Sequence, residues 1–156
     1  MSQEIQIGDR APDFSLENDK GEKVSLKDFR GKQVVLYFYP RDNTPGCTRE
    51  ACSFRDSLGS MTAKDAVVLG VSNDNINSHK KFKQKYSLNF PLLSDPNKEV
   101  SKAYGVYKLK NSYGIKHWGI ERSTFIIDGD GKITMMWRKV KVDGHAQEVL
   151  ETLSSI

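Results

Sequence analysis

Short apolar runs alternate along the chain with stretches in which apolar residues recur every three or four positions. The runs at 33–39, 65–72 and 123–128 lack regular polar alternation, which predicts strands buried on both faces. Helical spacing between the first two runs predicts a helix over 44–61. Its apolar positions are Cys47, Ala51, Phe54, Leu58 and Met61. The order of strand, helix and strand predicts an α/β fold with central parallel strands.

Two further helices follow from the same spacing. Apolar positions over 76–86 predict a helix with a lysine-rich outer face, and His79 lies at the edge of its apolar face. Apolar positions over 146–153 predict a C-terminal helix, for which Asp143 is the expected N-cap. We therefore expect helices to flank the sheet.

Turn sequences indicate two hairpins. The residues Asp128-Gly129-Asp130-Gly131 separate the run at 123–128 from a strand at 133–139, which adds antiparallel strands on one side of the sheet. Asp19-Lys20-Gly21 separates 14–17 from 23–26, which predicts an N-terminal β-hairpin extension. Residues 1–156 are expected to form a single α/β domain with a central mixed sheet.

Length and charge narrow the classes of partner. The chain has 156 residues, and 24 basic minus 20 acidic residues give a formal net charge of +4. This mild, dispersed charge predicts no nucleic-acid partner, and no apolar run approaches the roughly 20 residues of a membrane span. The N-terminus lacks a signal-peptide pattern, so we expect a cytoplasmic protein without a membrane partner. Two cysteines in that compartment suggest metal or redox chemistry.

The segment from Pro40 to Cys47 joins the first buried strand to the first helix. Thr44 is suited to the N-cap and Pro45 to the first helical position, so Cys47 falls in the first turn. Unpaired backbone N–H groups and the helix dipole stabilise a thiolate at such a position. Gly46 removes a side chain beside the sulfur and leaves room for a small substrate. These features predict a nucleophilic cysteine.

Cys52 follows Cys47 at five residues. On an ideal helix this separation gives a rise of about 7.5 Å and places the two Cα atoms about 8.7 Å apart on different faces. A disulfide needs about 7 Å or less, so a Cys47–Cys52 bond requires the first helical turns to unwind. From spacing alone, Cys52 is either a resolving thiol or a buried helix residue. The spacing and the three histidines do not favour zinc, and no metal is expected.

The residues Pro40, Thr44 and Cys47 have the spacing of the peroxiredoxin active-site motif, and the chain resembles that family along nearly its whole length. The residues 11–14, 35–40 and 90–95 resemble the family's opening segment, approach strand and middle strand. The segment 121–128 resembles the one that bears the active-site arginine, here Arg122. A Thr-Pro-Gly-Cys sequence with a second cysteine five positions later is similar to the bacterioferritin comigratory protein, or peroxiredoxin Q, subgroup.

The resemblance implies a thioredoxin-like fold and a thiol peroxidase without a cofactor. Cys47 would reduce hydrogen peroxide and organic hydroperoxides and become a sulfenic acid. Cys52 would then form an intramolecular disulfide with it, and thioredoxin or a similar dithiol would reduce that disulfide. Such a cycle serves antioxidant defence and cell redox homeostasis. Because the resolving cysteine is on the same chain, we expect a monomer.

The resemblance also implies roles for the residues around Cys47. Arg122 would favour the thiolate and bind the peroxide oxygens, and the Thr44 hydroxyl would orient the peroxide, in competition with its role as N-cap. The backbone N–H groups of Gly46 and Cys47 would stabilise charge as the O–O bond breaks, and Pro40 would shield the pocket. Glu50 and Arg55, which occur in the following helix, match supporting positions or belong to its ordinary surface.

Two other functions are open at this point. A general dithiol oxidoreductase is one, although its usual Cys-x-x-Cys spacing is absent and Arg122-Ser123 stands where a proline would be expected. A redox sensor or chaperone without turnover is the other, since oxidation of Cys47 could expose an unwound helix to a partner.

Overall fold

Strand β3 (Gln33–Phe38) lies in the interior of the sheet because its side chains are apolar on both faces. It pairs in parallel with β4 (Ala66–Ser72) and antiparallel with β8 (Ser123–Ile127). Every residue of β3 after Gln33 is buried. The predicted central mixed sheet is therefore confirmed, and the segment that leads to Cys47 leaves β3 at its carboxyl end.

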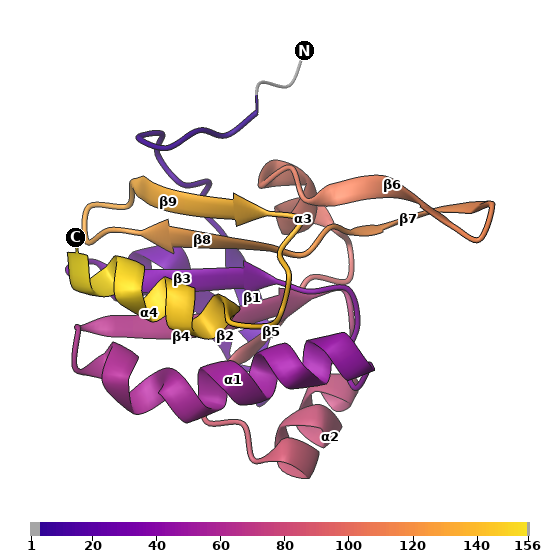
Figure 1. Cartoon of the computed structure of the whole chain (residues 1–156), viewed down its shortest axis with the longest axis horizontal. Helices are drawn as coiled ribbons and strands as arrows, with labels where there is room; N and C mark the ends of the chain where they lie inside the picture. The colour runs from indigo at the N-terminus through magenta and orange to yellow at the C-terminus, as the bar shows by residue number, and fades with distance from the viewer. Residues whose placement is uncertain (1–3, 156) are drawn as a thin grey trace.

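The computed structural model describes residues 4–155, apart from the side chain of Ser112. Seven strands form one sheet in the order β2-β1-β5-β4-β3-β8-β9, and two more form a separate hairpin (Figure 1). The remaining strands are β1 (Ser15–Asn18), β2 (Lys23–Ser25), β5 (Leu92–Ser94), β6 (Tyr107–Ser112), β7 (Ile115–Ile120) and β9 (Ile133–Arg138). The helices are η1 (Leu26–Phe29), α1 (Pro45–Thr62), α2 (Ile76–Tyr86), α3 (Glu99–Ala103) and α4 (His145–Ser155).

Two core layers cover the two faces of the sheet. On one face, Val35 and Tyr37 pack with side chains of α1, α2 and α4, and the rings of Tyr37 and Phe54 stack with centroids 4.7 Å apart. On the other face, Leu36 packs with the N-terminal segment and with Tyr104, which follows α3. The alternation of side chains along β3 thus supplies both layers.

The predicted hairpins lie at opposite edges of the main sheet. β8 and β9 pair antiparallel beside β3, and the segment that contains Asp128–Gly131 makes the turn between them. β1 and β2 also pair antiparallel, and β1 joins the sheet through β5. The N-terminal hairpin is therefore an integral edge of the sheet.

The helix boundaries agree with the spacing, but one predicted cap is wrong. The N–H of Glu148 donates to the carbonyl of Gly144, which makes Gly144 the N-cap of α4 in place of Asp143. Glycine is also tolerated at this position, and Gly144 has φ of +77°.

The separate hairpin of β6 and β7 is absent from the sequence-based prediction. It projects from the sheet on the side where β3 ends and α1 begins (Figure 1). Most of its side chains are exposed or half-buried, so the strands lack the buried face that produces a clear hydrophobic pattern. Its turn residues Tyr113 and Gly114 have φ of +54° and +80°, as a two-residue hairpin turn of type I′ requires.

The helices of the chain are short or polar. No helix within residues 4–155 has the length and apolar character that crossing a membrane requires.

Candidate active site

Cys47 lies in the first turn of α1, at the carboxyl end of β3. The backbone of Thr44 is extended (φ −93°, ψ 156°) and Pro45 is the first helical residue, as their positions in the sequence predicted. The Cys47 side chain is 2% exposed. Pro40 is half-buried and lies two residues after the end of β3. The fold therefore brings a thiol to a helix N-terminus at the point where ligands of α/β sheets usually bind.

Thr44 is the N-cap by position, yet its side chain does not cap the helix. Its hydroxyl donates to the carbonyl of Arg41 at 2.9 Å, and no helix N–H donates to it. The side-chain cap expected of Thr44 is therefore absent, and its role toward the peroxide stays a prediction. The proton of the hydroxyl is engaged, and the oxygen has lone pairs left to accept a hydrogen bond.

The backbone N–H groups of Gly46 and Cys47 point out of the start of α1. The first hydrogen bond at this end runs from the N–H of Thr48 to the carbonyl of Thr44. Within residues 4–155 the N–H groups of Gly46 and Cys47 have no acceptor, as expected for the first turn of a helix. They are two adjacent donors beside the Cys47 sulfur.

Arg122 approaches the thiol from the segment between β7 and β8. Its Nη2 lies 3.4 Å from Cys47 Sγ, and its Nη1 donates to Glu50 Oε1 at 2.6 Å. A Cβ on Gly46 would lie 3.2 Å from Nη2, so the glycine gives the guanidinium room. Burial lowers the pKa of Arg122, but the charges and hydrogen bonds of Glu50 and Cys47 outweigh it and raise that pKa overall. The arginine is therefore a fixed cation at the sulfur.

Glu50 is a buried acid, and a reading as ordinary helix surface is wrong. It is 2% exposed, and its Oε2 has no hydrogen-bond partner among the described residues. Burial raises the pKa of Glu50 from 4.5 to about 7, although Arg122 acts in the opposite direction. The sequence spacing indicated that Glu50 lies near Cys47, because a residue three positions after Cys47 lies on the same side of the helix.

Arg55 and Cys52 lie further along the same helix. Arg55 pairs with Asp56 at 3.0 Å and donates to the carbonyl of Tyr86 at 2.6 Å, so it ties α1 to the end of α2. Cys52 is half-buried, and both cysteines are free thiols. Because α1 is continuous from Pro45 to Thr62, the helix geometry that separates the two cysteines is present.

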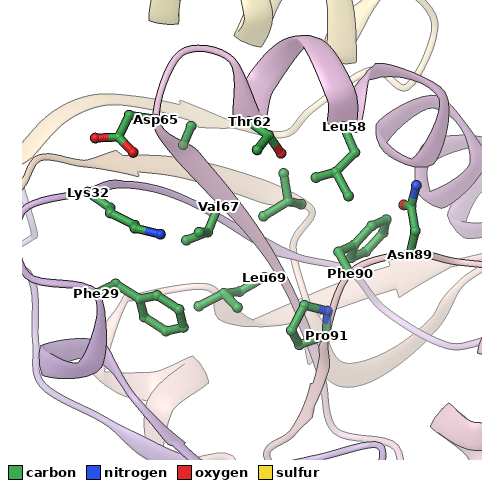
Figure 2. Close-up of a pocket in the computed structure, with 12 residues that line it drawn as sticks. Phe29, Lys32, Leu58, Thr62, Asp65, Val67, Leu69, Asn89, Phe90 and Pro91 are labelled. Atoms are coloured by element: carbon green, nitrogen blue, oxygen red, sulfur yellow. The ribbon is translucent and has the colours of Figure 1, made fainter.

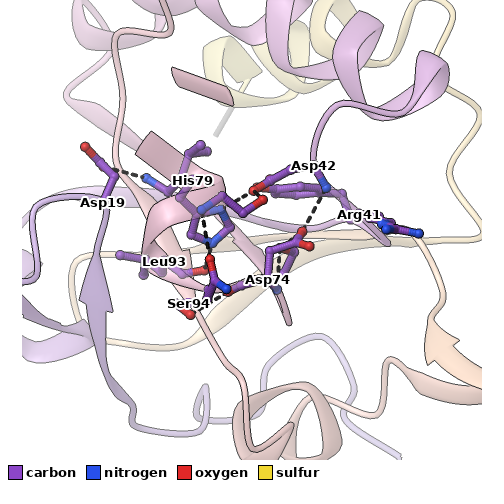
Figure 3. Close-up of polar contacts among 12 residues, drawn as sticks. Asp19, Arg41, Asp42, Asp74, His79, Leu93 and Ser94 are labelled. Carbon is purple, nitrogen blue, oxygen red and sulfur yellow. Dashed lines mark hydrogen bonds and ion pairs between the residues drawn. The ribbon is translucent and has the colours of Figure 1, made fainter. Parts of the chain in front are cut away.

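The loop before Cys47 is held by a buried polar cluster around Asp42 (Figure 3). The carboxylate of Asp42 accepts hydrogen bonds from Tyr39 and Ser78, and His79 Nδ1 lies 2.7 Å from its Oδ2. The backbone N–H of Asp42 donates to Asp74 at 2.8 Å. The next residue, Asn43, accepts hydrogen bonds from Lys85 and Tyr86 through its side-chain amide oxygen. Sequence reasoning missed this cluster because its members are far apart in the chain.

The Asp42 cluster is a structural anchor. One oxygen or nitrogen of each of Asp42, Asp74 and His79 lies within 4.8 Å of the others, which is compatible with a metal by distance alone. However, His79 Nδ1 faces the carboxylate of Asp42 and its Nε2 faces the carbonyl of Leu93 at 3.0 Å. Both ring nitrogens therefore face protein oxygens, and the contacts of His79 are those of a residue that anchors the loop.

An apolar pocket of about 210 Å³ lies near the other end of α1 (Figure 2). Leu58 and Thr62 of α1 face the first residues of β4 across it, and Phe90 and Pro91 close one side. Cys47 does not line this pocket. The site around the sulfur is formed instead by Arg122 and the start of α1.

Comparison with known proteins identifies the class. Residues 7–136 match the AhpC/TSA family, and the chain belongs to that family. It is a peroxiredoxin, and peroxiredoxins are thiol-dependent peroxidases. The resemblance seen in the sequence is thereby confirmed.

The relatives narrow the class to the Bcp, or peroxiredoxin Q, group. The peroxiredoxin Bcp of Bacillus subtilis is 52% identical over 152 residues, covering 97% of each chain. A cysteine mutant of PrxQ from Xylella fastidiosa superposes with a TM-score of 0.93 at 40% identity, over 99% of this chain and 98% of the other. The bacterioferritin comigratory protein of Xanthomonas campestris, studied for alkyl peroxide reduction, superposes with a TM-score of 0.89 at 40% identity. The match covers 97% of this chain and 96% of the other.

Proposed function

We propose that Cys47 is the peroxidatic cysteine and Cys52 the resolving cysteine of this thiol peroxidase. The observation that carries the proposal is the environment of the Cys47 sulfur. Arg122 lies 3.4 Å from it, and the N–H groups of Gly46 and Cys47, which have no acceptor within residues 4–155, belong to the same helical turn. This arrangement can bind a peroxide and stabilise the charge that leaves the sulfur.

In the first step the Cys47 thiolate attacks one oxygen of a hydroperoxide. A sulfur–oxygen bond forms, the O–O bond breaks, and the departing oxygen takes a proton to leave as water or an alcohol. The sulfur is oxidised to a sulfenic acid while the peroxide is reduced by two electrons. Arg122 donates to the oxygens throughout, the Thr44 oxygen accepts from the peroxide O–H, and Pro40 shields the sulfur.

In the second step the Cys52 thiol condenses with the sulfenic acid. A disulfide bond forms and one water molecule leaves. In the intact helix the two Cα atoms are about 8.7 Å apart by ideal geometry, so the first turns of α1 must unwind. Thioredoxin or a similar dithiol then supplies two electrons and two protons, and both cysteines return to thiols.

We further propose that residues 1–156 act as one thioredoxin-like domain and as a monomer in the cytoplasm. One sheet with a core layer on each face supports the single domain. The two free thiols suit a reducing compartment. Reduction of hydrogen peroxide and organic hydroperoxides there would serve antioxidant defence and redox homeostasis.

Peroxide-dependent oxidation of NADPH, coupled through thioredoxin and thioredoxin reductase, tests this cycle. The wild-type protein should turn over, and Cys47→Ser should be inactive. Cys52→Ser should undergo one oxidation of Cys47 by peroxide but recycle poorly. Wild-type turnover by Cys47→Ser would refute the nucleophile, and unchanged turnover by Cys52→Ser would assign the resolving role to another thiol. Reduction of insulin disulfides without peroxidase activity would favour a dithiol oxidoreductase, and oxidation without turnover a sensor.

A further inference from the structure

The hairpin of β6 and β7 concentrates the exposed apolar surface of the molecule. Five large hydrophobic side chains are exposed among residues 4–155, and four of them belong to this hairpin. These are Leu109 (52% exposed), Tyr113, Ile115 and Trp118 (59% exposed). Contiguous exposed apolar groups on a protein surface commonly mark an interaction site.

The register of the hairpin sorts its side chains onto two faces. Tyr107 pairs with Ile120 and Leu109 pairs with Trp118, so these side chains share one face. The rings of Tyr107 and Trp118 stack with centroids 5.7 Å apart. Together with Lys102 they line an open hollow of about 450 Å³. We refer to Tyr107, Leu109 and Trp118 as the hairpin face.

Positive charge surrounds the hairpin face. The ammonium groups of Lys98 and Lys102 lie 6.0 and 5.7 Å from the centre of the Tyr107 ring. By the same register Lys116 lies on the hairpin face, whereas Lys108 and Lys110 lie on the opposite face of the hairpin, and the segment 107–120 has no acidic residue. A partner with apolar side chains and neighbouring carboxylates would complement this surface.

The hairpin is also continuous with the active site. β7 ends at Ile120, two residues before Arg122, and the N–H of Glu121 donates to the carbonyl of Val106 at 2.7 Å. Burial and the Arg122 guanidinium lower the pKa of Lys110, which lies on the face of the hairpin opposite Leu109 and Trp118. A protein seated on the hairpin would therefore lie at the end of the sheet where β3 leads to Cys47 (Figure 1).

We propose that the hairpin face is the docking surface for the dithiol protein that reduces the Cys47–Cys52 disulfide. This inference rests on the proposed recycling by such a protein. Each turnover must bring a foreign dithiol to this side of the molecule, and stacked aromatic residues are typical anchors of protein interfaces. The chemistry of the surface selects a reductant with an apolar, carboxylate-bearing rim around its dithiol.

The double variant Leu109→Ser/Trp118→Ser tests the proposal. With peroxide saturating, the KM for thioredoxin should rise about tenfold or more while the limiting kcat changes little, because anchor residues dominate interface affinity. Single-turnover oxidation by peroxide and turnover with dithiothreitol should equal those of the wild type. The matched control is Ile7→Ser, which removes a 57% exposed side chain near Ile133, at the other end of β9 from the site.

A charge variant keeps the test valid if the double variant folds poorly. Lys116→Glu changes an exposed side chain, and it should lower kcat/KM for thioredoxin and weaken its salt dependence. An unchanged KM for thioredoxin in both variants overturns the docking surface. So does a defect confined to hydroperoxides embedded in anionic vesicles, or a wild-type dimer that the variants dissociate. Wild-type turnover with dithiothreitol but not with thioredoxin refutes the choice of reductant in the proposed function instead.

Discussion

Replacement of Glu50 by glutamine tests whether the ion pair with Arg122 compensates for the burial of the Glu50 carboxylate beside Cys47. The carboxylate is 2% exposed, one of its oxygens pairs with Arg122 at 2.6 Å, and the other has no partner among residues 4–155. Burial raises the pKa of Glu50 from 4.5 to about 7 because the single arginine compensates only part of the lost hydration. Glutamine has the same shape and resembles the protonated acid.

The size of the effect follows from the two pKa values. The difference, 7 − 4.5, at about 1.4 kcal/mol per pH unit gives about 3 kcal/mol. Because the pKa is raised on folding, neutral Glu50 contributes stability that is fully present below about pH 4.5 and is lost as the pH rises through about 7. At pH 8 the Glu50→Gln variant should therefore be more stable than the wild type by up to about 3 kcal/mol.

Urea unfolding of the reduced protein between pH 5 and pH 8.5 measures this difference. The stability of Glu50→Gln minus that of the wild type should increase across the range, with equal m-values. Glu151→Gln is the matched control, since Glu151 is exposed on α4, and its difference from the wild type should be flat. A flat difference for Glu50→Gln as well would show that Arg122 compensates the buried carboxylate fully, and the reasoning would be refuted.

Three further substitutions test other parts of the site and core. Arg122→Lys should slow the second-order oxidation of Cys47 in stopped flow by about a hundredfold, because the forked donor geometry is lost, and an unchanged rate would remove Arg122 from the chemistry. Phe54→Ala should lower the free energy of unfolding by about 3–5 kcal/mol, and a loss below about 1 kcal/mol would contradict its tight stacking on Tyr37. Asp42→Asn should lower the free energy of unfolding by about 3 kcal/mol, because it removes the negative charge that His79 faces. An unchanged unfolding midpoint would show that the Asp42 cluster does not stabilise the fold.

The sequence predicted the central strands because each is apolar on both faces. The bounds of β3, β4 and α1 agree with their hydrophobic runs to within a residue or two, as local periodicity allows. The hairpin of β6 and β7 escaped prediction because it buries little surface and pairs with no strand of the main sheet. Hydrophobic pattern reports burial, and an exposed element leaves little of it.

Some residues around Cys47 could be predicted from local sequence spacing, and others could not. Cys47, Thr44 and Gly46 are close in sequence, so helix-terminus chemistry predicted their positions from spacing alone. The position of Arg122 came from resemblance, because no local rule places residue 122 beside residue 47. The buried state of Glu50 and the Asp42 cluster depend on the packing of separate elements, which only the folded chain defines.

The contacts that hold the chain before and after the first turns of α1 affect which reaction the oxidised Cys47 undergoes next. Asp42 and Asn43 are tied to α2, and Phe54 is packed beneath α1 against Tyr37. If only the residues between these points unwind, Cys52 stays tethered within a few residues of the oxidised Cys47. Its thiol is then present at a high effective concentration, as for any well-held intramolecular reactant. Closure of the disulfide would be favoured over attack by a second peroxide molecule, which would convert the sulfenic acid irreversibly to a sulfinic acid.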